Sequence, residues 1–388
     1  MRSLIRWVVV TVVLLHGLLH LLGVAKAFGW ADVTQLTEPI GTFQGAAWLL
    51  AAVLLIVTGL LLAARGRWWW IVGAVAVLVS QAAILTSWSD AKAGTLANVV
   101  LLVAVGYGFL SQGPSSFRAE YRRRVTAALA EPVAAAVVTE TDLAHLPTPV
   151  AAYVRQAGTV GRPRVTNFHA RIHGRIRGGP NKPWMTFTGE QVNTYGRRPS
   201  RLFFIDATMF GLPVDVLHVY VGRSATMRVK VCSLIPMVNA AGPDLDRAET
   251  VTMFNDLCVL APAALVDAPV DWDLIDDRHV RGTYTNGAHT VTAELTFNEG
   301  HELIGFVSDD RWGASTNGKP VVPQRWSTPI GDYRTLDSRR IGATGEGRWR
   351  TADEDYAYLE FRVDDIVYNV GSAEPGGVRE EAAFKTVG

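Results

Sequence analysis

The stretch GPSSFRAEYRRR, residues Gly113 to Arg124, separates two very different halves of this chain of 388 residues. The sequence before it consists of long apolar runs, and the sequence after it alternates between apolar and polar residues. Long apolar runs are typical of membrane-spanning helices, whereas alternation is typical of half-buried strands. We therefore predict an α+β protein, with an N-terminal four-helix transmembrane bundle and a mostly antiparallel β soluble domain, in which a curved sheet or half-barrel packs on helices.

Four apolar runs within residues 1–112 approach or exceed the ~20 residues needed to cross a bilayer. They cover about residues 4–24, 43–64, 69–87 and 95–110. The first run is too long for the apolar part of a signal peptide, and no clear cleavage site of small residues follows it. We therefore expect four transmembrane helices in a multi-pass protein of the cell (plasma) membrane.

The Lys and Arg residues of the short loops predict the orientation of these helices, because cytoplasmic loops carry an excess of both. Only Lys26 and Lys92 lie on one side of the membrane. Eight arginines lie on the other side: Arg2, Arg6, Arg65, Arg67, Arg118, Arg122, Arg123 and Arg124. This imbalance predicts that the N-terminus and the soluble domain are both cytoplasmic.

The cluster Arg122, Arg123 and Arg124 has two possible partners, nucleic acid and lipid. The whole chain has 37 Lys and Arg residues against 36 Asp and Glu residues, so it lacks the basic excess of nucleic-acid-binding proteins. Beside a membrane span, the three arginines are better explained as an orientation signal that contacts anionic lipid head groups. We predict the lipid bilayer as a partner, and no nucleic acid.

His16 and His20 lie four residues apart in the first apolar run, and so on one face of the predicted helix. One interpretation is a metal, haem or quinone site, which would make the protein a membrane oxidoreductase. The other is hydrogen bonding between helices of the bundle. Because a metal site needs one or two further ligands and no acid or thiol lies at matching depth, His16 and His20 are weak metal candidates, and we predict no cofactor.

The sequence after residue 112 is divided into a basic helical linker (113–138), a β-rich domain (139–371) and a disordered tail (372–388). A helix is predicted around 246–258, because apolar residues recur there at helical spacing behind a capping-box pattern. Twelve strands are predicted at regular spacing: Val165–Ile176, Trp184–Thr194, Arg201–Met209, Val214–Val221, Thr226–Leu234, Asp271–Ile275, Arg278–Tyr284, Thr290–Phe297, Leu303–Asp309, Arg325–Tyr333, Gly345–Thr351 and Tyr356–Tyr368. Short turns between strands favour an antiparallel meander.

Motifs of known chemistry are scarce in this sequence. There is no GxSxG nucleophile motif, and His301-Glu302 lacks the second histidine of a zincin helix. The glycine-rich segment Gly342–Gly347 has its glycines in the wrong order for a dinucleotide-binding loop, and we interpret it as a turn. Cys232 and Cys258 are interpreted as buried small hydrophobic residues, although a single bridge between them stays open. No catalytic residues are predicted.

Several blocks of the sequence, between about Leu146 and Asn369, resemble an uncharacterised bacterial membrane-protein family, a domain of unknown function. The blocks are Leu146-Pro147, Tyr153–Gly158, Gly161–Val165, Trp184–Phe187, Glu190-Gln191, Ala241–Asp246 with Glu249, Trp326-Ser327 and Asp332-Tyr333. Some members of this family are similar in having an N-terminal four-span segment. More loosely, the strand pattern resembles the half-barrel of lipoprotein carriers, which holds lipid. Those carriers work outside the cytoplasmic membrane, in conflict with the orientation predicted from the arginines.

These patterns favour a membrane-anchored protein whose β-rich domain binds an apolar or amphiphilic, lipid-like ligand in a concave, mostly apolar site. Two alternatives stay open, the oxidoreductase described above and a regulatory module that binds a partner protein through a sheet edge. The predicted ligand-lining residues are Phe168, Ile172, Phe187, Phe204, Met227, Val229 and Phe254.

Overall fold

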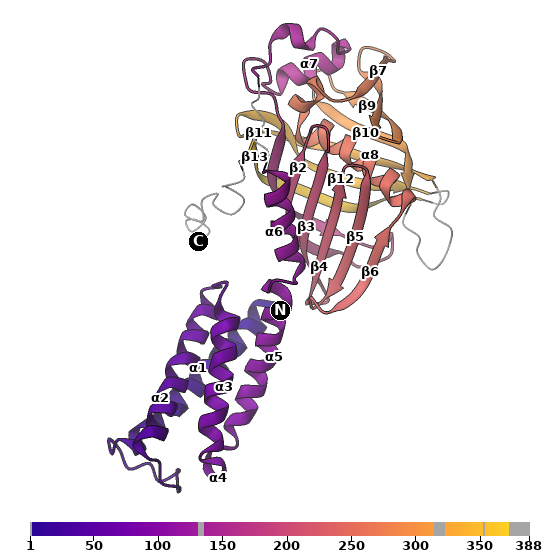
Figure 1. The fold of residues 1–388 in the computed structure, drawn as a ribbon. Coiled ribbons are helices and arrows are strands. Elements are labelled where there is room, and N and C mark those ends of the chain that lie inside the picture. Colours follow the sequence, from indigo (N-terminus) through magenta and orange to yellow (C-terminus); the bar gives the residue numbers. More distant parts are fainter. Residues whose placement is uncertain (1, 131–135, 314–322, 352–353, 372–388) are drawn as a thin grey trace. The chain divides into compact units, whose positions relative to one another are not determined.

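The computed structural model describes residues 2–130, 136–313, 323–351 and 354–371. The described chain is α+β, as the sequence predicts, and it forms a helical unit up to Ala119 and a β-rich unit from Glu120 (Figure 1). The predicted disordered tail, residues 372–388, lies outside the described residues, as does part of the predicted linker, 131–135.

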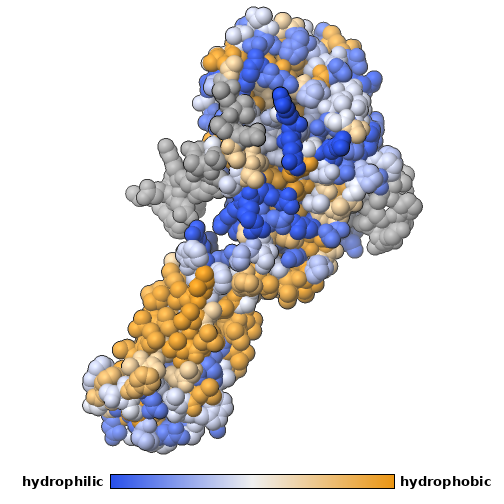
Figure 2. All heavy atoms as spheres, in the orientation of Figure 1, coloured by the Kyte–Doolittle hydropathy of each residue, from blue (hydrophilic) through white to orange (hydrophobic). Residues whose placement is uncertain are grey.

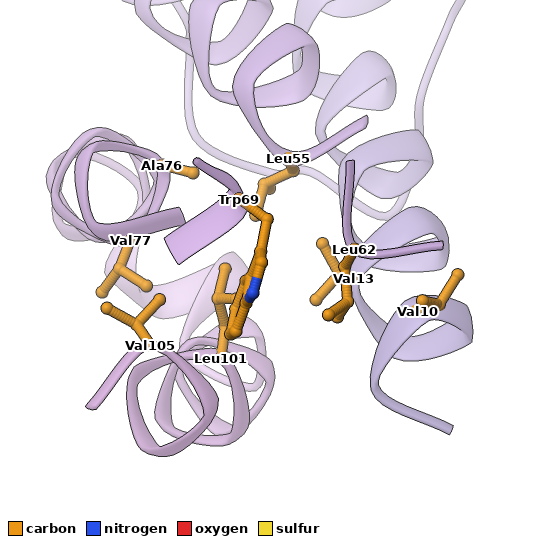
Figure 3. Close-up of a cluster of buried hydrophobic side chains, with 9 residues drawn as sticks. All are labelled: Val10, Val13, Leu55, Leu62, Trp69, Ala76, Val77, Leu101 and Val105. Atoms are coloured by element: carbon orange, nitrogen blue, oxygen red, sulfur yellow. The ribbon is translucent and has the colours of Figure 1, made fainter. Parts of the chain in front are cut away.

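The helical unit contains α1 (Arg2–Ala27), α2 (Thr42–Ala63), α3 (Trp69–Leu85), the single turn α4 (Trp88–Ala91) and α5 (Gly94–Gln112). Apolar side chains from the four long helices meet in its interior (Figure 3): Val10, Val13, Leu55, Leu62, Trp69, Ala76, Val77, Leu101 and Val105. Many others point outward, so the unit is also apolar on its surface, as Figure 2 shows. A helix that is apolar on all sides is typical of membrane spans.

Among the described residues, three stretches are long and apolar enough to cross a bilayer: Ser3–Ala27, Thr42–Ala63 and Gly94–Ala128. The helix α3 is apolar but has only 17 residues. At 1.5 Å per residue it is about 26 Å long, slightly less than the ~30 Å hydrocarbon thickness of a bilayer. The third predicted span, 69–87, is therefore a shorter helix than the other three.

In the described part of the β-rich unit, thirteen strands form one antiparallel sheet. Their bounds are β1 Asn167–Ile176, β2 Met185–Thr194, β3 Ser200–Met209, β4 Leu212–Val221, β5 Ser224–Val231, β6 Ile235–Ala241, β7 Val270–Leu274, β8 His279–Asn286, β9 His289–Phe297, β10 Leu303–Trp312, β11 Pro323–Leu336, β12 Arg339–Arg350 and β13 Asp355–Tyr368. Consecutive strands pair in two meanders, β1 to β6 and β7 to β13, and pairing of β1 with β13 joins the meanders in the middle of the sheet.

The helix α8 (Pro243–Leu260) carries the chain from one edge of the sheet to the other, because β6 and β7 are the two edge strands. It contacts strands of both meanders, and the sheet curves around it (Figure 1). All its residues from Ala248 to Leu260 are buried. The predicted helix therefore exists, but it begins before Asp246, whose carboxylate accepts a hydrogen bond from the Ala225 N–H at 2.6 Å instead of capping the helix.

The described residues of the β-rich unit also form the short helices η1 (Glu140–Leu143), α7 (Thr148–Gln156) and η2 (Pro262–Val266). Tyr153 of α7 is buried, and its hydroxyl donates a hydrogen bond to the Cys258 carbonyl oxygen at 2.7 Å. This bond ties α7 to the last turn of α8. Gly158 follows α7 with φ +73°, the left-handed conformation that glycine adopts most easily after a helix.

The amphipathic helix α6 (Phe117–Ala128) lies within the predicted basic linker. Tyr121 and Val125 are buried, and the Tyr121 ring lies 6.1 Å from the ring of Phe204 on β3. Arg124 is paired with Glu120 at 2.8 Å, and Glu120 is also paired with Arg228 of β5 at 2.7 Å. Arg124 of the predicted lipid-binding cluster therefore has a partner within the protein.

The glycine-rich segment Gly342–Gly347 is not a turn, as its sequence suggests, but the middle of β12. The reason is packing. A Cβ atom on Gly345 would lie 2.7 Å from the Phe361 ring, and one on Gly347 would lie 2.9 Å from the Tyr358 ring. Glycine in a strand interior often marks such close approach. The glycines of β12 therefore make room for aromatic side chains of β13.

The two cysteines are both free thiols, and only one of them matches its predicted environment. Cys258 is fully buried in α8. Cys232 is only partly buried, and it lies in the turn between β5 and β6 with φ +53°.

Candidate functional site

A cavity of about 300 Å³ lies between the sheet and α8. The helix contributes a stripe of side chains at helical spacing, from Thr252 through Asn255, Asp256 and Val259 to Leu260. Residues three and four apart lie on one face of a helix, so α8 presents a single face to this space. The cavity is of the size and composition found in small-molecule sites, which are concave and mostly apolar.

Most of the remaining wall is apolar and comes from neighbouring strands. Ile205 of β3, Val216 of β4 and Val229 of β5 are direct cross-strand neighbours, and all three line the cavity. The further apolar lining consists of Ile172, Ile176, Met185, Phe187, Phe203, Ala207, Val214, Met227, Trp326, Leu359 and Phe361. Along β3, β4 and β5, alternation places every second side chain in the cavity.

Four of the seven predicted ligand-lining residues line this cavity: Ile172, Phe187, Met227 and Val229. They come from β1, β2 and β5, which are not all adjacent in the sheet. The structure therefore brings them together, and their contact with a ligand stays a prediction.

The other three predicted residues do not line the cavity. Phe204 points to the opposite face of β3 from its neighbours Phe203 and Ile205, and stacks near Tyr121. Phe168 lies at the start of β1, where its ring packs between two tyrosines. Phe254 lies on the far side of α8 from Asp256 and packs against aromatic residues of the second meander.

A buried ion pair between Arg201 and Asp256 forms part of the cavity wall. The Arg201 Nε donates to Asp256 Oδ2 at 2.7 Å, and their side chains are only 8% and 9% exposed. Gln191 Nε2 and Asn193 Nδ2 donate to the same oxygen at 2.7 and 3.0 Å. Three donors on one carboxylate oxygen offset its desolvation, because hydrogen bonds to a charged group are strong.

A second buried carboxylate, Glu249, lies beside this pair and is 1% exposed. Its ion-pair distances are long: 3.6 Å to Arg201 Nη1, 3.4 Å to Arg311 Nη2 and 3.2 Å to His218 Nε2. Burial acts to raise the pKa of Glu249, but His218, Arg311 and Arg201 outweigh it and hold that pKa below its ordinary value. Glu249 is therefore a buried anion that depends on Arg201 and Arg311, its two cationic neighbours at neutral pH.

His218 of β4 is uncharged at neutral pH. Burial lowers the pKa of His218 to about 4, with Arg201 and Arg311 adding to the shift and Glu249 opposing it. The cluster thus contains two cations, Arg201 and Arg311, and two anions, Glu249 and Asp256, and its charge is balanced.

The sequence does contain a signal for this polar cluster. Arg201 occupies the same strand face as Phe203, Ile205 and Ala207, a position where an apolar residue is expected. Glu249 and Asp256 lie seven residues apart, two turns along α8. A charged residue on an apolar face needs a buried partner, and the only way to find that partner from sequence is to search the facing element for opposite charge.

In the helical unit, His16 and His20 belong to a hydrogen-bonded network. His16 Nε2 lies 3.1 Å from Ser80 Oγ and 3.2 Å from Asn98 Oδ1, and His20 Nε2 lies 2.8 Å from Ser80 Oγ. Asn98 Nδ2 donates to Gln81 Oε1 at 3.0 Å. The network connects α1, α3 and α5. This arrangement agrees with the second interpretation of the two histidines, hydrogen bonding between helices. Among the described residues, no group of three or more His, Cys, Asp or Glu side chains is arranged to hold a metal.

A comparison with curated proteins finds no match. A comparison with solved structures finds a putative outer membrane lipoprotein-sorting protein domain from Vibrio parahaemolyticus, with TM-score 0.34, 8% identity and coverage of 55% of this chain and 88% of that one. A LolA superfamily protein from Nitrosomonas europaea has TM-score 0.33, 10% identity and coverage of 56% and 92%. A DUF1329 family protein from Desulfovibrio piger has TM-score 0.33, 12% identity and coverage of 57% and 92%.

A match to a family model agrees with the first resemblance found in the sequence, to a domain of unknown function. The model of the Family of unknown function (DUF6544) matches residues 136–361, which is more than half of the chain, and the chain therefore belongs to this family.

Proposed function

We propose that the β-rich unit binds an apolar or amphiphilic, lipid-like ligand in the cavity between the sheet and α8. The observation that carries the proposal is the composition of this cavity, an apolar wall built from several strands with a charge-balanced polar cluster on one side. Such a space matches a molecule with an apolar body and a polar group. We further propose that the helical unit anchors the protein in a membrane, with its four long helices as the spans.

The proposal that the cavity holds a ligand is tested by filling the cavity with a larger side chain. Val216 is half-buried and lines the cavity, whereas Val221, also half-buried, lies at the end of the same strand and outside the cavity. The Val216→Trp variant is expected to lose the bound ligand, because the indole ring occupies the space next to Ile205 and Val229. The matched Val221→Trp variant is expected to retain it. The full chains are purified in detergent, extracted with organic solvent and compared by mass spectrometry.

Lipids that adhere to the helical unit do not affect the difference between the two variants, because both variants carry the same helices. A lipid-like species that is stoichiometric in the wild type and in Val221→Trp, and depleted in Val216→Trp, is the expected result. Equal lipid content in all three proteins, at matched melting temperature, would refute the proposal that this cavity holds a ligand.

The orientation is tested by labelling engineered cysteines. Asp277, in the turn between β7 and β8, and Asp32, between α1 and α2, are both exposed. In a Cys232→Ser background, with Cys258 fully buried, an impermeant maleimide applied to intact spheroplasts is expected to label Asp32→Cys. The Asp277→Cys variant is expected to react only after permeabilisation, because the arginine-rich loops favour the cytoplasmic side. The reverse pattern would place the β-rich unit outside.

A further inference from the structure

Two nitrogen atoms of cavity-lining side chains, Asn255 Nδ2 and Arg311 Nε, have no hydrogen-bond partner within the described structure. A third, His218 Nε2, lies 3.2 Å from Glu249 Oε2 but makes no hydrogen bond of good geometry with it. Asn255 is only 6% exposed. A buried donor without a partner is costly, and native structures retain few of them. Unsatisfied donors in the wall of a cavity therefore indicate that the occupant supplies the acceptors.

Arg311 of β10 is oriented mainly by aromatic rings, and its Nη2 donates one long hydrogen bond, to Glu249 Oε1 at 3.4 Å. Its guanidinium carbon lies 4.4 Å from the ring centre of Trp326 and 5.5 Å from that of Trp349. Stacking on aromatic rings fixes the plane of a guanidinium group. Its contact with Glu249 is long, at 3.4 Å, and leaves the Nε atom unused. Arg311 is thus a rigidly held cation whose Nε donor has no partner in the described structure.

Arg201 has a different role from Arg311, although both line the cavity. Its Nε donates to Asp256 at 2.7 Å, and its Nη2 lies 3.4 Å from Gln191 Oε1. Arg201 therefore holds the wall together, and Arg311 is the cation left to meet a ligand. Glu346, the remaining carboxylate of the wall, is paired with Arg348 at 2.6 Å.

The chemistry of these donors selects among polar groups. A carboxylate has two acceptor oxygens that can receive several hydrogen bonds, and the guanidinium fork matches its planar geometry. A neutral carbonyl oxygen satisfies fewer donors, and an ammonium group satisfies none of them. The cavity wall therefore fits an acceptor-rich, anionic group better than a neutral or cationic one.

We propose that the ligand is a long-chain carboxylate, whose carboxylate is bound by Arg311 and Asn255 and whose hydrocarbon chain lies along the apolar wall of Phe187, Val216 and Val229. This inference rests on the proposed function, since it names the head group of the molecule that the cavity holds. Glu249 acts as the counter-ion of Arg311 while the cavity is empty.

The test uses two fluorescent probes that differ only in the head group, 11-(dansylamino)undecanoic acid and its methyl ester. Both are titrated against the full chain in detergent at pH 8, where the probe carboxyl is ionised. The wild type is expected to bind the acid about tenfold more tightly than the ester, the ratio that corresponds to one hydrogen bond to a charged group.

The decisive variant is Asn255→Leu, which has nearly the same shape. Because Asn255 Nδ2 has no partner in the empty protein, this change is expected to leave the melting temperature unchanged or raised. It is expected to weaken binding of the acid and to leave binding of the ester within twofold. Arg311→Gln is expected to abolish the preference for the acid. Asn181→Leu, at an exposed turn, is the matched control and should behave as the wild type.

The outcomes separate the two proposals. If neither probe binds the wild type and Val216→Trp changes nothing, the ligand-binding function itself is overturned, and the head-group inference with it. If both probes bind equally and Asn255→Leu alters neither, the cavity binds ligand but does not recognise a carboxylate. If Arg311→Gln does not fold, Asn255→Leu alone decides, because it removes no hydrogen bond from the empty protein.

Discussion

Replacing Asp256 with asparagine is expected to lower the melting temperature of the β-rich unit by roughly 10 °C. Removing one partner of a buried ion pair costs about 3–5 kcal/mol, because the other charge stays buried without compensation. For a unit of this size, each kcal/mol corresponds to about 2–4 °C. The effect is large here because Asp256 Oδ2 accepts hydrogen bonds from Arg201, Gln191 and Asn193 at once. The melting temperature of the full chain in detergent, followed by circular dichroism of the strands, measures it.

The control is an exposed ion pair of similar geometry. Arg325 and Asp309 lie 2.8 Å apart, and their side chains are 47% and 66% exposed. An exposed pair contributes about 0–1 kcal/mol, so Asp309→Asn should change the melting temperature by a few degrees at most. The double variant Arg201→Met with Asp256→Leu should recover part of the loss, since no buried charge is then unpaired. Equal effects of Asp256→Asn and Asp309→Asn would show that the buried pair is not important for stability.

Replacing Phe254 with alanine is expected to cost about 3–5 kcal/mol, the range for truncating a large buried aromatic residue. The Phe254 side chain is fully buried. Its ring centre lies 5.4 Å from those of Tyr284 and Phe306 and 6.2 Å from that of Trp272. The variant loses these contacts and leaves a void on the side of α8 that faces β8 and β10. Chemical denaturation of the full chain measures the loss.

A second substitution at Phe254 distinguishes core packing from ligand binding. Because Phe254 does not line the cavity, Phe254→Leu, the milder change, is expected to bind both dansyl probes with wild-type affinity while the protein is less stable. A Phe254 variant with normal stability and lost ligand would contradict this assignment, and would support the direct ligand contact that the sequence suggested.

The alternation of apolar and polar residues predicted the strands well wherever one face of the strand is buried. Thr290–Phe297, for example, is observed as His289–Phe297, with Val291, Ala293 and Leu295 buried. The strand β6 was missed, because Ile235–Ala241 contains a proline and has exposed apolar residues without alternation. It is an edge strand that pairs only with β5, so no second neighbour constrains its sequence. The glycines of β12 were misinterpreted because their partners are rings on another strand.

The candidate site was predicted only in its apolar part. The alternation of β5 correctly places Met227 and Val229 on the covered face of the sheet, because a sheet with one apolar face must bury that face against another element. Phe204 could not be assigned correctly, since Tyr121 of the amphipathic helix α6 packs against it on the outer face of β3, so that apolar side chains are buried on both faces of the strand. The polar cluster requires residues from β3, β4, α8 and β10 to meet, and a single sequence does not show which of its charges are paired.

The pairing of β1 with β13 has a consequence for biosynthesis. The first strand of the sheet is made early, yet one of its two neighbours is the last strand of the unit, with partners such as His173 and Asp364 separated by 191 positions. At about 5–20 residues per second, the ribosome needs roughly 10–40 s to deliver that neighbour. During this time the first meander carries an open, unpaired edge that is prone to association with other chains. Premature termination removes a central strand rather than a peripheral one, so shortened chains should be cleared by quality control rather than accumulate as folded fragments.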